Sequence, residues 1–173
     1  MNGNQGFHTV RGYEILGKQQ QVLSHSMEDY LEMIYRSSMV EGYTRINTLA
    51  ELLNVQAPSA TRMVQKLSKL GFVKYERYSI VRLTPKGEKV GKFLLDRHQI
   101  IEEFLKLIGV EDKLLKNVEL IEHNVTVDAL NKIEMLNKFF NTYPETLEKF
   151  MEYRMACNKK ENGTSGTVPY ESV

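Results

Sequence analysis

Two short helical patterns separated by a tight turn, and followed by two β-prone runs, constrain the fold of this chain more than any other feature of its sequence. The first helical pattern covers 48–53 and the second covers 58–70. The β-prone runs 72–76 and 80–83 have the spacing of a small hairpin. Helix, turn, helix and hairpin in this order predict a winged helix-turn-helix domain.

Helical periodicity also accounts for most of the chain outside this unit. Ser26, followed three residues later by Asp29, is typical of a capping box at the start of a helix that ends near Gly42. The Thr84-Pro85 pair starts a long helix, because a capping residue followed by proline suits the first helical turn. Three further helices are predicted over 114–123, 127–143 and 145–155. The predicted fold class is therefore mostly α, with an N-terminal winged helix-turn-helix domain that carries a small β wing, followed by an all-helical domain.

The domain boundaries that we predict follow these patterns. Polar residues without a sustained period precede the first helix, and a Gly/Ser/Thr-rich stretch ends the chain. We expect a mobile N-terminal extension over 1–24, a winged-helix domain over 25–92, a helical domain over 93–155 and a disordered tail over 156–173.

Charge is distributed unevenly along the chain, although the formal net charge of its 173 residues is only +1. Residues 44–92 contain ten Lys and Arg against three Asp and Glu, whereas residues 98–153 contain six against eleven. A basic segment beside an acidic one suggests one surface for a polyanion and another for cations or for self-association. Two solvated faces of uneven charge would give the same counts.

The composition indicates the cellular compartment in which we expect this chain to function. No apolar run approaches the roughly 18 residues that a membrane span needs, and the N-terminus lacks the apolar stretch of a secretory signal. The single cysteine, Cys157, excludes an internal disulfide framework and a Cys-rich zinc site. We therefore expect a cytoplasmic protein without a membrane partner.

The basic winged-helix segment suits duplex DNA, because a helix fits the major groove and Lys or Arg side chains contact phosphates. The candidates are outward-facing residues of the second short helix and two arginines of the wing. The predicted DNA-contacting residues are Ser59, Ala60, Arg62, Met63, Lys66, Lys69, Arg77 and Arg82. Arg62 is the preferred base reader or phosphate clamp. A winged helix used only for protein contacts remains an alternative.

Carboxylate and imidazole groups that can ligate a metal occur on three predicted helices. The candidate ligands are Asp29 and Glu32 on the first helix, His98 on the long helix, and Glu119, Glu122 and His123 on the helix that follows. The spacing places those that share a helix on one face of it. If the three helices meet, four carboxylates and two imidazoles form a hard, oxygen-rich site for two divalent ions, which suits Mn²⁺ or Fe²⁺ better than Cu(I) or a structural zinc. Capping and surface carboxylates, a polar helix face and a core histidine are the ordinary alternatives, and spacing alone does not show that the helices meet.

Five segments together resemble the manganese-regulator branch of the diphtheria toxin repressor family. In one-letter code they are SMEDYLE at 26–32, MVQKL at 63–67, LTPKG at 83–87, RH at 97–98 and VELIEH at 118–123. The similarity covers about residues 26–153. It implies a homodimeric, metal-activated transcriptional repressor of metal-uptake genes, with an N-terminal winged helix that binds operator DNA and a helical domain for metal binding and dimerisation.

The resemblance also implies how the ligands are shared between two ions in each subunit. One ion would be held by Asp29, Glu32, His98 and Glu122, and the other by Glu32, Glu119, Glu122 and His123. The iron-sensing relatives have a methionine and a cysteine where this chain has Asp29 and Glu119, so the resemblance favours Mn²⁺, with Fe²⁺ or other divalent metals as possible activators. No organic cofactor is expected.

Three other functions stay open at this point. The first is an iron-responsive repressor of the same family. The second is a dinuclear carboxylate enzyme, which would lack the paired Glu-x-x-His motifs of ferritin-like proteins and would leave the basic winged helix unexplained. The third is a metal-independent winged-helix regulator that senses a small organic ligand. We predict a manganese-responsive repressor and not an enzyme.

Overall fold

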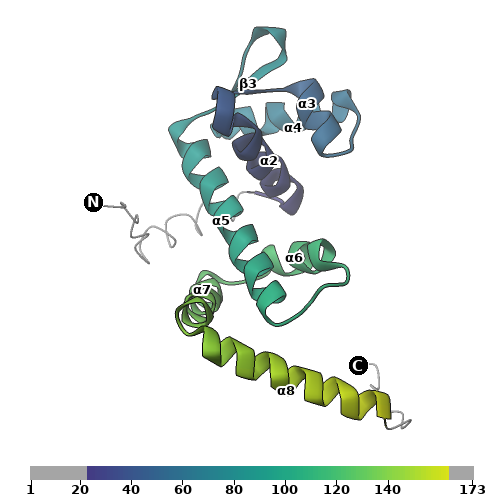
Figure 1. The fold of residues 1–173 in the computed structure, drawn as a ribbon. Helices are drawn as coiled ribbons and strands as arrows, with labels where there is room; N and C mark the ends of the chain where they lie inside the picture. The colour runs from purple at the N-terminus through teal and green to yellow at the C-terminus, as the bar shows by residue number, and fades with distance from the viewer. Residues whose placement is uncertain (1–22, 164–173) are drawn as a thin grey trace.

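The computed structural model describes residues 23–163 as a series of helices with one small sheet (Figure 1). The elements are α2 (His25–Glu41), β1 (Thr44–Arg45), α3 (Ile46–Leu52), α4 (Ala57–Lys69), β2 (Val73–Tyr75), the 3₁₀ turn η1 (Arg77–Ser79), β3 (Ile80–Leu83), α5 (Pro85–Leu107), α6 (Leu114–Glu122), α7 (Val127–Thr142) and α8 (Pro144–Gly163). This order confirms the predicted fold class, with the wing placed after the helix-turn-helix pair.

Helix α2 begins slightly earlier than the sequence predicts. Ser24, and not Ser26, has the extended N-cap conformation, and its carbonyl accepts hydrogen bonds from the N–H groups of Met27 and Glu28. The predicted capping box is therefore wrong, because Ser26 lies inside the first turn. The helix ends as predicted, where Gly42 takes the left-handed conformation at φ 72°, which glycine adopts without a steric cost.

The two short helices form the expected helix-turn-helix pair. Helix α3 starts at Ile46, two residues before the predicted start, because Arg45 is extended and pairs as part of β1. Helix α4 starts at Ala57, one residue before the predicted start, and carries Pro58 in its first turn. The buried sides of the two helices, which include Leu49 and Val64, pack into the core of the winged helix.

The wing is the β2–β3 hairpin of a three-stranded antiparallel sheet, whose order is β1-β3-β2. Strands β2 and β3 pair through Val73 with Leu83, which confirms the predicted hairpin. Strand β1 was not predicted, and it pairs with β3 through Thr44 and Val81. With only two residues, β1 is too short to show the alternation by which a strand is recognised in a sequence.

Helix α5 connects the winged helix to the helices that follow (Figure 1). Its first turn is capped by the Thr84 hydroxyl, which accepts from the Gly87 N–H at 3.1 Å. Gly87 lies so close to the preceding hairpin that a Cβ atom there would stand 1.9 Å from the carbonyl oxygen of Phe72. The start of α5 is therefore fixed against the sheet.

Helix α5 continues without a break through the predicted domain boundary at 92/93. Its buried face first packs on α2, and then on α6 and α7. Its buried face is an apolar stripe that includes Val90, Leu94 and Ile101, all fully buried. One helix thus spans both halves of the molecule, and the division into domains stays a prediction.

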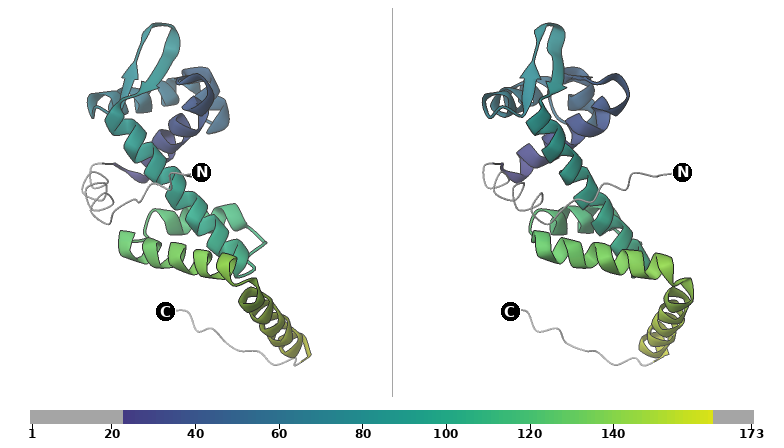
Figure 2. Two further views of the ribbon diagram at one scale, coloured as in Figure 1. Left: turned by 60° about the vertical axis from the view of Figure 1, so that its left-hand side comes forward. Right: turned by 90° about the vertical axis from the view of Figure 1, so that its left-hand side faces the viewer.

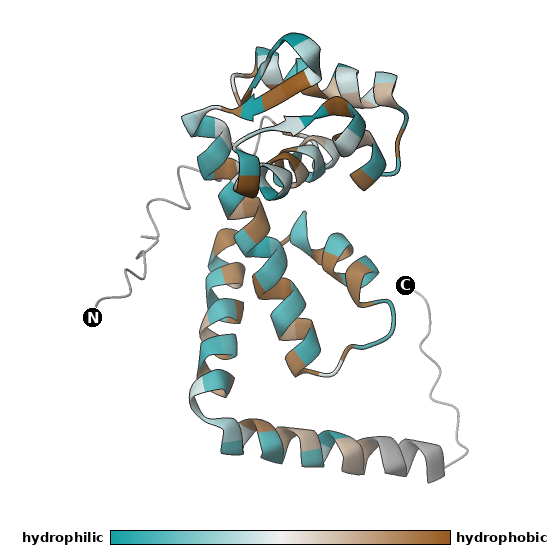
Figure 3. Ribbon diagram, turned by 45° about the horizontal axis from the view of Figure 1, so that its top comes forward, coloured by the Kyte–Doolittle hydropathy of each residue, from teal (hydrophilic) through white to brown (hydrophobic). Residues whose placement is uncertain are grey.

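The last three helices leave many apolar side chains in contact with solvent. On α6, Leu115 and Ile121 are 62% and 37% exposed. On α7, Leu136 and Phe139 are also exposed. Figure 3 shows hydrophobic positions along these helices as well as in the winged-helix half.

Helix α8 leaves α7 at an angle and extends away from the rest of the molecule (Figure 2). It continues to Gly163, so the prediction of a disordered tail from residue 156 is wrong as far as residue 163. The stretch before Gly163 contains Lys, Glu and Asn but no proline, so nothing in it breaks a helix. Residues 164–173 lie outside the described part of the chain.

The N-terminal prediction also needs a correction at its edge. Residues 1–22 of the expected extension lie outside the described residues, but Leu23 is buried and belongs to the hydrophobic core. None of the described helices is both long and apolar enough to cross a membrane.

Candidate metal centre

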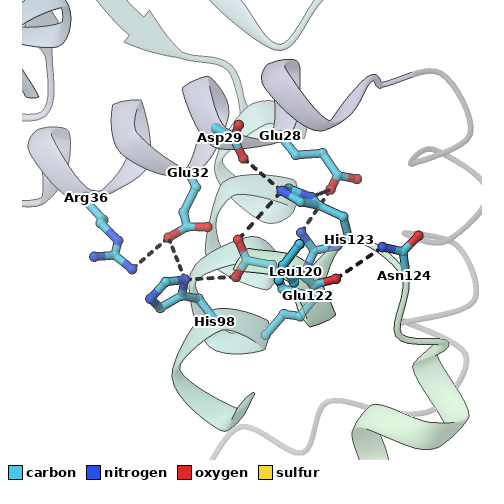
Figure 4. A network of polar contacts seen from close by, with 10 residues as sticks. Glu28, Asp29, Glu32, Arg36, His98, Leu120, Glu122, His123 and Asn124 are labelled. Atoms are coloured by element: carbon cyan, nitrogen blue, oxygen red, sulfur yellow. Dashed lines mark hydrogen bonds and ion pairs between the residues drawn. The ribbon is translucent and has the colours of Figure 1, made fainter. Parts of the chain in front are cut away.

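The three helices that carry the candidate ligands meet at one place, where α5 packs on both α2 and α6 (Figure 4). The ligand atoms fall into two groups, and within each group all of them lie within 4.8 Å of one another. The first group is Asp29, Glu119, Glu122 and His123, and the second group is Glu32, His98 and Glu122. All six residues that the sequence singled out are therefore brought together, and Glu122 is common to both groups.

The grouping differs in part from the one that the resemblance implied. Asp29 lies with His123, whose Nε2 is 3.1 Å from its Oδ1, and not in the group of Glu32 and His98. Glu122 is common to both groups, whereas Glu32 belongs to one group only. Which ligands hold which ion stays a prediction.

His98 and Glu122 form a buried contact between the two groups of the site. His98 is 8% exposed and Glu122 is 2% exposed. The Nδ1 atom of His98 lies 2.8 Å from Oε2 of Glu122 and 3.9 Å from Oε1 of Glu32. The hydrogen bond to Glu122 raises the pKa of His98, against the opposing effect of burial. In the absence of a metal, this contact therefore favours a protonated imidazole.

The carboxylates of α2 also have perturbed pKa values. Burial is the main cause of the raised pKa of Asp29, and the nearby charges of Glu119 and Glu122 add to it, while His123 lowers it. Burial likewise raises the pKa of Glu32, and Arg36, whose guanidinium lies 2.7 Å from the Glu32 carboxylate, opposes this. Both shifts mean that ionising these carboxylates costs free energy in the metal-free protein.

The excess of negative charge makes the donor set a good match for divalent cations. Among the described residues, no lysine or arginine forms an ion pair with Asp29, Glu119 or Glu122; the ion pairs of Asp29 and Glu122 are with His98 and His123. Carboxylate oxygens and imidazole nitrogens are ligands that Mn²⁺ and Fe²⁺ accept. The residues present therefore fit a divalent metal centre.

Two buried residues at the site were missed by the sequence reasoning. Glu28, 5% exposed, accepts hydrogen bonds from Arg97, 3% exposed, and from Nδ1 of His123, each at 2.9 Å. Glu28 and Arg97 directly precede the candidate ligands Asp29 and His98 in the chain, and this adjacency was the one available signal. An acidic residue in the first turn of a helix ordinarily indicates only a favourable interaction with the helix dipole.

The candidate DNA-contacting residues of α4 lie on its outward face with two exceptions. Ser59, Arg62, Lys66 and Lys69 are exposed. Met63 is half-buried against the core. Ala60 is fully buried, so its prediction as an outward-facing contact is wrong. Its small apolar side chain packs inside the winged helix, on the same side as Val64.

The two candidate arginines of the wing are exposed but differ in their contacts. Arg77 begins the turn between β2 and β3. The guanidinium of Arg82 lies 3.7 Å from the Glu76 carboxylate and 5.1 Å from the ring centroid of Tyr43. Arg82 is therefore held at the base of the wing, whereas Arg77 projects from its tip.

Comparisons with known proteins match both halves of the chain. A family profile described as "Iron dependent repressor, N-terminal DNA binding domain" matches residues 22–81, and one described as "Iron dependent repressor, metal binding and dimerisation domain" matches residues 84–151. A protein of Shouchella clausii (strain KSM-K16) named "HTH-type transcriptional regulator MntR" is 44% identical over 128 residues, which are 73% of this chain and 90% of that protein. The protein of the same name from Bacillus pumilus (strain SAFR-032) is 42% identical over 137 residues, which are 79% of this chain and 93% of that protein.

Solved structures give the same result for the fold. "Structure of the manganese regulator SloR" matches with a TM-score of 0.56 and 30% sequence identity, over 66% of this chain and 53% of that one. "X-ray crystal structure of metal-dependent transcriptional regulator MtsR" matches with a TM-score of 0.60 and 26% identity, over 65% of this chain and 54% of that one. The chain thus spans about half the length of these two structures, but almost all of the two MntR sequences.

Proposed function

The chain belongs to the iron-dependent repressor family, and on that premise we propose that it is a manganese-responsive repressor that binds operator DNA as a metal-loaded homodimer. The observation that carries the proposal is the position of the ligand cluster. Its carboxylates and imidazoles come from α2 in the winged helix, from α6 in the helical half and from α5, which runs through both. The distances between the ligands of such a site change whenever the winged helix moves relative to the helical half.

We assign the six clustered residues as ligands of two Mn²⁺ ions in each subunit. They are Asp29, Glu32, His98, Glu119, Glu122 and His123. Two groups of donor atoms that share Glu122 support two ions with a bridging carboxylate. Carboxylates at positions 29 and 119, with no sulfur ligand in either group, favour Mn²⁺, and Fe²⁺ is the alternative metal.

The charges of the cluster explain how metal would control the protein. Without metal, Asp29, Glu119 and Glu122 repel one another, and this repulsion works against the contact between α2 and α6. Bound dications supply the positive charge that removes the repulsion. The carboxylates then hold α2 and α6 in one fixed arrangement, and the two winged helices of a homodimer favour the spacing that matches successive major grooves. By linkage, operator DNA and metal each strengthen the binding of the other by the same factor.

The proposed DNA-binding surface combines the exposed face of α4 with the wing. It contains Ser59, Arg62, Met63, Lys66 and Lys69 of α4 and Arg77 and Arg82 of the wing. Arg62 lies in the N-terminal half of α4, the part of a recognition helix that meets base edges. Its replacement by alanine should weaken operator binding without changing the number or affinity of the bound Mn²⁺ ions. Loss of Mn²⁺ binding in Arg62→Ala would argue against this division of roles.

The exposed apolar side chains of α6 and α7 are the proposed interface of the homodimer. Leu115 and Leu120 on α6 and Met135 and Phe139 on α7 are each more than two-fifths exposed. Single apolar residues on a surface are common, but several on two consecutive helices that both pack on α5 favour a protein contact. The match to a dimerisation domain over 84–151 supports the same assignment.

The enzymatic alternative does not apply to this chain. The relatives that it covers almost completely are named transcriptional regulators, and its N-terminal half matches a DNA-binding domain. The chain is therefore a regulator and not a dinuclear carboxylate enzyme.

A gel-shift titration with DNA from upstream of metal-transporter genes tests the proposed function. We expect a retarded complex with Mn²⁺, its loss on adding a chelator, and its absence at all Mn²⁺ concentrations for Glu122→Ala. Glu134→Ala is the matched control, because Glu134 lies on α7, where it forms a surface ion pair with Lys138. DNA binding that chelator leaves unchanged would favour a metal-independent regulator, and a full Mn²⁺ response in Glu122→Ala would refute the ligand assignment.

A further inference from the structure

Glu28 occupies a buried position at which α2, α5 and α6 meet (Figure 4). Nη2 of Arg97, on α5, and Nδ1 of His123, at the end of α6, both lie 2.9 Å from the same oxygen, Oε2 of Glu28. An ionised carboxylate only accepts hydrogen bonds, so both nitrogens donate to it. Glu28 belongs to neither group of candidate metal ligands.

Arg97 is sufficient to explain why Glu28 is charged at this depth. A buried carboxylate needs a cation or several hydrogen-bond donors, and the guanidinium, itself 3% exposed, supplies the charge. The contact with His123 is additional to that requirement. The contact between Glu28 and His123 therefore acts on His123, and it is not needed to neutralise Glu28.

The contact with Glu28 determines which nitrogen of His123 faces the ligand cluster. With Nδ1 donating to Glu28, the Nε2 atom lies 3.1 Å from Oδ1 of Asp29 and 3.8 Å from Oε1 of Glu122. A neutral imidazole that carries its proton on Nδ1 has its lone pair on Nε2. The lone pair is then directed toward the carboxylates with which His123 would share an ion.

The His123 ring is also restrained from one of its faces. The ring of His25 stacks on it, with the centroids 4.5 Å apart and the planes at 6°. A ring that is stacked on one face and hydrogen-bonded at Nδ1 has little freedom to turn about its side-chain bonds. The structure thus restrains both the tilt and the hydrogen-bonding edge of His123.

We propose that Glu28, held in place by Arg97, is a positioning residue that keeps the proton of His123 on Nδ1 and presents its Nε2 atom to the metal. This inference rests on the proposed metal site and extends it by a residue that does not touch the ion. Groups of this kind orient the ligands of many metal sites, and their removal ordinarily lowers metal affinity 10–100-fold.

Two replacements of Glu28 separate positioning from a structural role. Glu28→Gln removes the charge that pairs with Arg97 but keeps an oxygen that can accept from His123, whereas Glu28→Ala removes both. If Glu28 positions His123, Glu28→Gln should keep its Mn²⁺ affinity within about threefold of wild type, and Glu28→Ala should lose about 10–100-fold, as measured by calorimetry on the full chain. If only the ion pair with Arg97 matters, the two variants should lose affinity equally, and this result would overturn the proposal.

The protonation of His123 is measured separately. Long-range ¹H–¹⁵N correlation spectra of the Cd²⁺-loaded full chain, with Cd²⁺ as a diamagnetic probe, should show the His123 proton on Nδ1 in wild type and in Glu28→Gln. A proton on Nε2 in wild type would overturn the proposal without any mutation, so the test holds even if Glu28→Ala fails to fold. Glu103→Ala is the matched control, because Glu103 accepts hydrogen bonds from two asparagines that link α5 to α7, away from the ligand cluster.

The same titrations distinguish this inference from the proposed function. If wild type binds no Mn²⁺, the metal site itself is refuted. If wild type binds Mn²⁺ and Glu28→Ala binds it with equal affinity, the metal site stands and only the role of Glu28 is refuted.

Discussion

Replacing Glu119 by glutamine tests whether the ligand cluster is destabilised by its own negative charge. The Glu119 carboxylate lies within 4.8 Å of ligand atoms of Asp29 and Glu122, and it forms no ion pair with a lysine or arginine among the described residues. Its charge contributes to the raised pKa of Asp29. The neutral amide should therefore stabilise the metal-free protein and at the same time weaken Mn²⁺ binding.

The size of the gain follows from the separation of the charges. Two unit charges about 4 Å apart interact by about 1 kcal/mol in water and by about 4 kcal/mol at an effective dielectric constant near 20. The lower value applies, because Glu119 is exposed to solvent. A gain of about 1 kcal/mol corresponds to a rise in Tm of about 2–4 °C for a chain of this size.

The loss on the metal side is of similar size. With free Mn²⁺ at about 100 times the wild-type Kd, binding adds about 2.7 kcal/mol to the free energy of unfolding. A tenfold weaker affinity removes about 1.4 kcal/mol of this. The variant should therefore show only about half of the Mn²⁺-induced stabilisation of wild type, or less.

Thermal unfolding followed by circular dichroism, with chelator and with Mn²⁺, measures both effects in one experiment. Glu134→Gln is the control, because it removes a carboxylate that is paired with Lys138 at 2.6 Å, so the metal-free protein should gain nothing. A metal-free Glu119→Gln protein that is less stable than wild type would refute the repulsion argument. A full Mn²⁺-induced rise in its Tm would refute Glu119 as a ligand.

Three further expectations concern pH, packing and assembly. The raised pKa of His98 contributes stability that is fully present below its ordinary pKa of 6.5 and is lost as the pH rises through the higher pKa of the folded protein. The metal-free protein should therefore have a lower free energy of urea unfolding at pH 8 than at pH 6. The Mn²⁺ affinity should rise over the same pH interval, because the ligands must lose their protons to bind the ion. Gly87→Ala should destabilise the winged helix by about 3 kcal/mol, because the new Cβ atom would lie 1.9 Å from the Phe72 carbonyl oxygen. The loss is measured as a lower denaturant midpoint at constant slope, and an unchanged midpoint would contradict this packing. Phe139→Glu should convert the dimer to a monomer in sedimentation experiments while each subunit still binds Mn²⁺, and a dimer that persists would move the interface away from this part of α7.

The elements that the sequence predicted correctly are those with strong local signals. Gly42 ends α2, and Thr84 followed by Pro85 starts α5, because capping and the steric limits of proline and glycine act within a few residues. Strand β1 was missed because it depends on a partner strand that lies far along the chain. Ala60 was assigned to the wrong face, since a single methyl group gives little hydrophobic signal whether it is buried or exposed.

For the candidate metal centre too, features within one helix were predictable from the sequence, whereas contacts between distant residues were not. Spacing along α6 placed Glu119, Glu122 and His123 on one side, which is a property of a single helix. Their meeting with α2 and α5 was implied by the resemblance and not by the spacing. The role of Glu28 was not predictable in either way, because it depends on contacts with residues 69 and 95 positions farther along the chain.

The continuity of α5 has a mechanical consequence for reading DNA. Its 23 residues form a rod about 34 Å long, attached to the β wing at one end and to α6 and α7 at the other. A stiff rod of this length converts a tilt of about 5° into a displacement of about 3 Å at its far end, close to the 3.4 Å rise of one base pair. His98 lies nine residues, or about 14 Å, from the end of the rod that packs on α6 and α7, so the same tilt moves His98 by about 1.2 Å and is amplified about 2.5-fold at the winged helix.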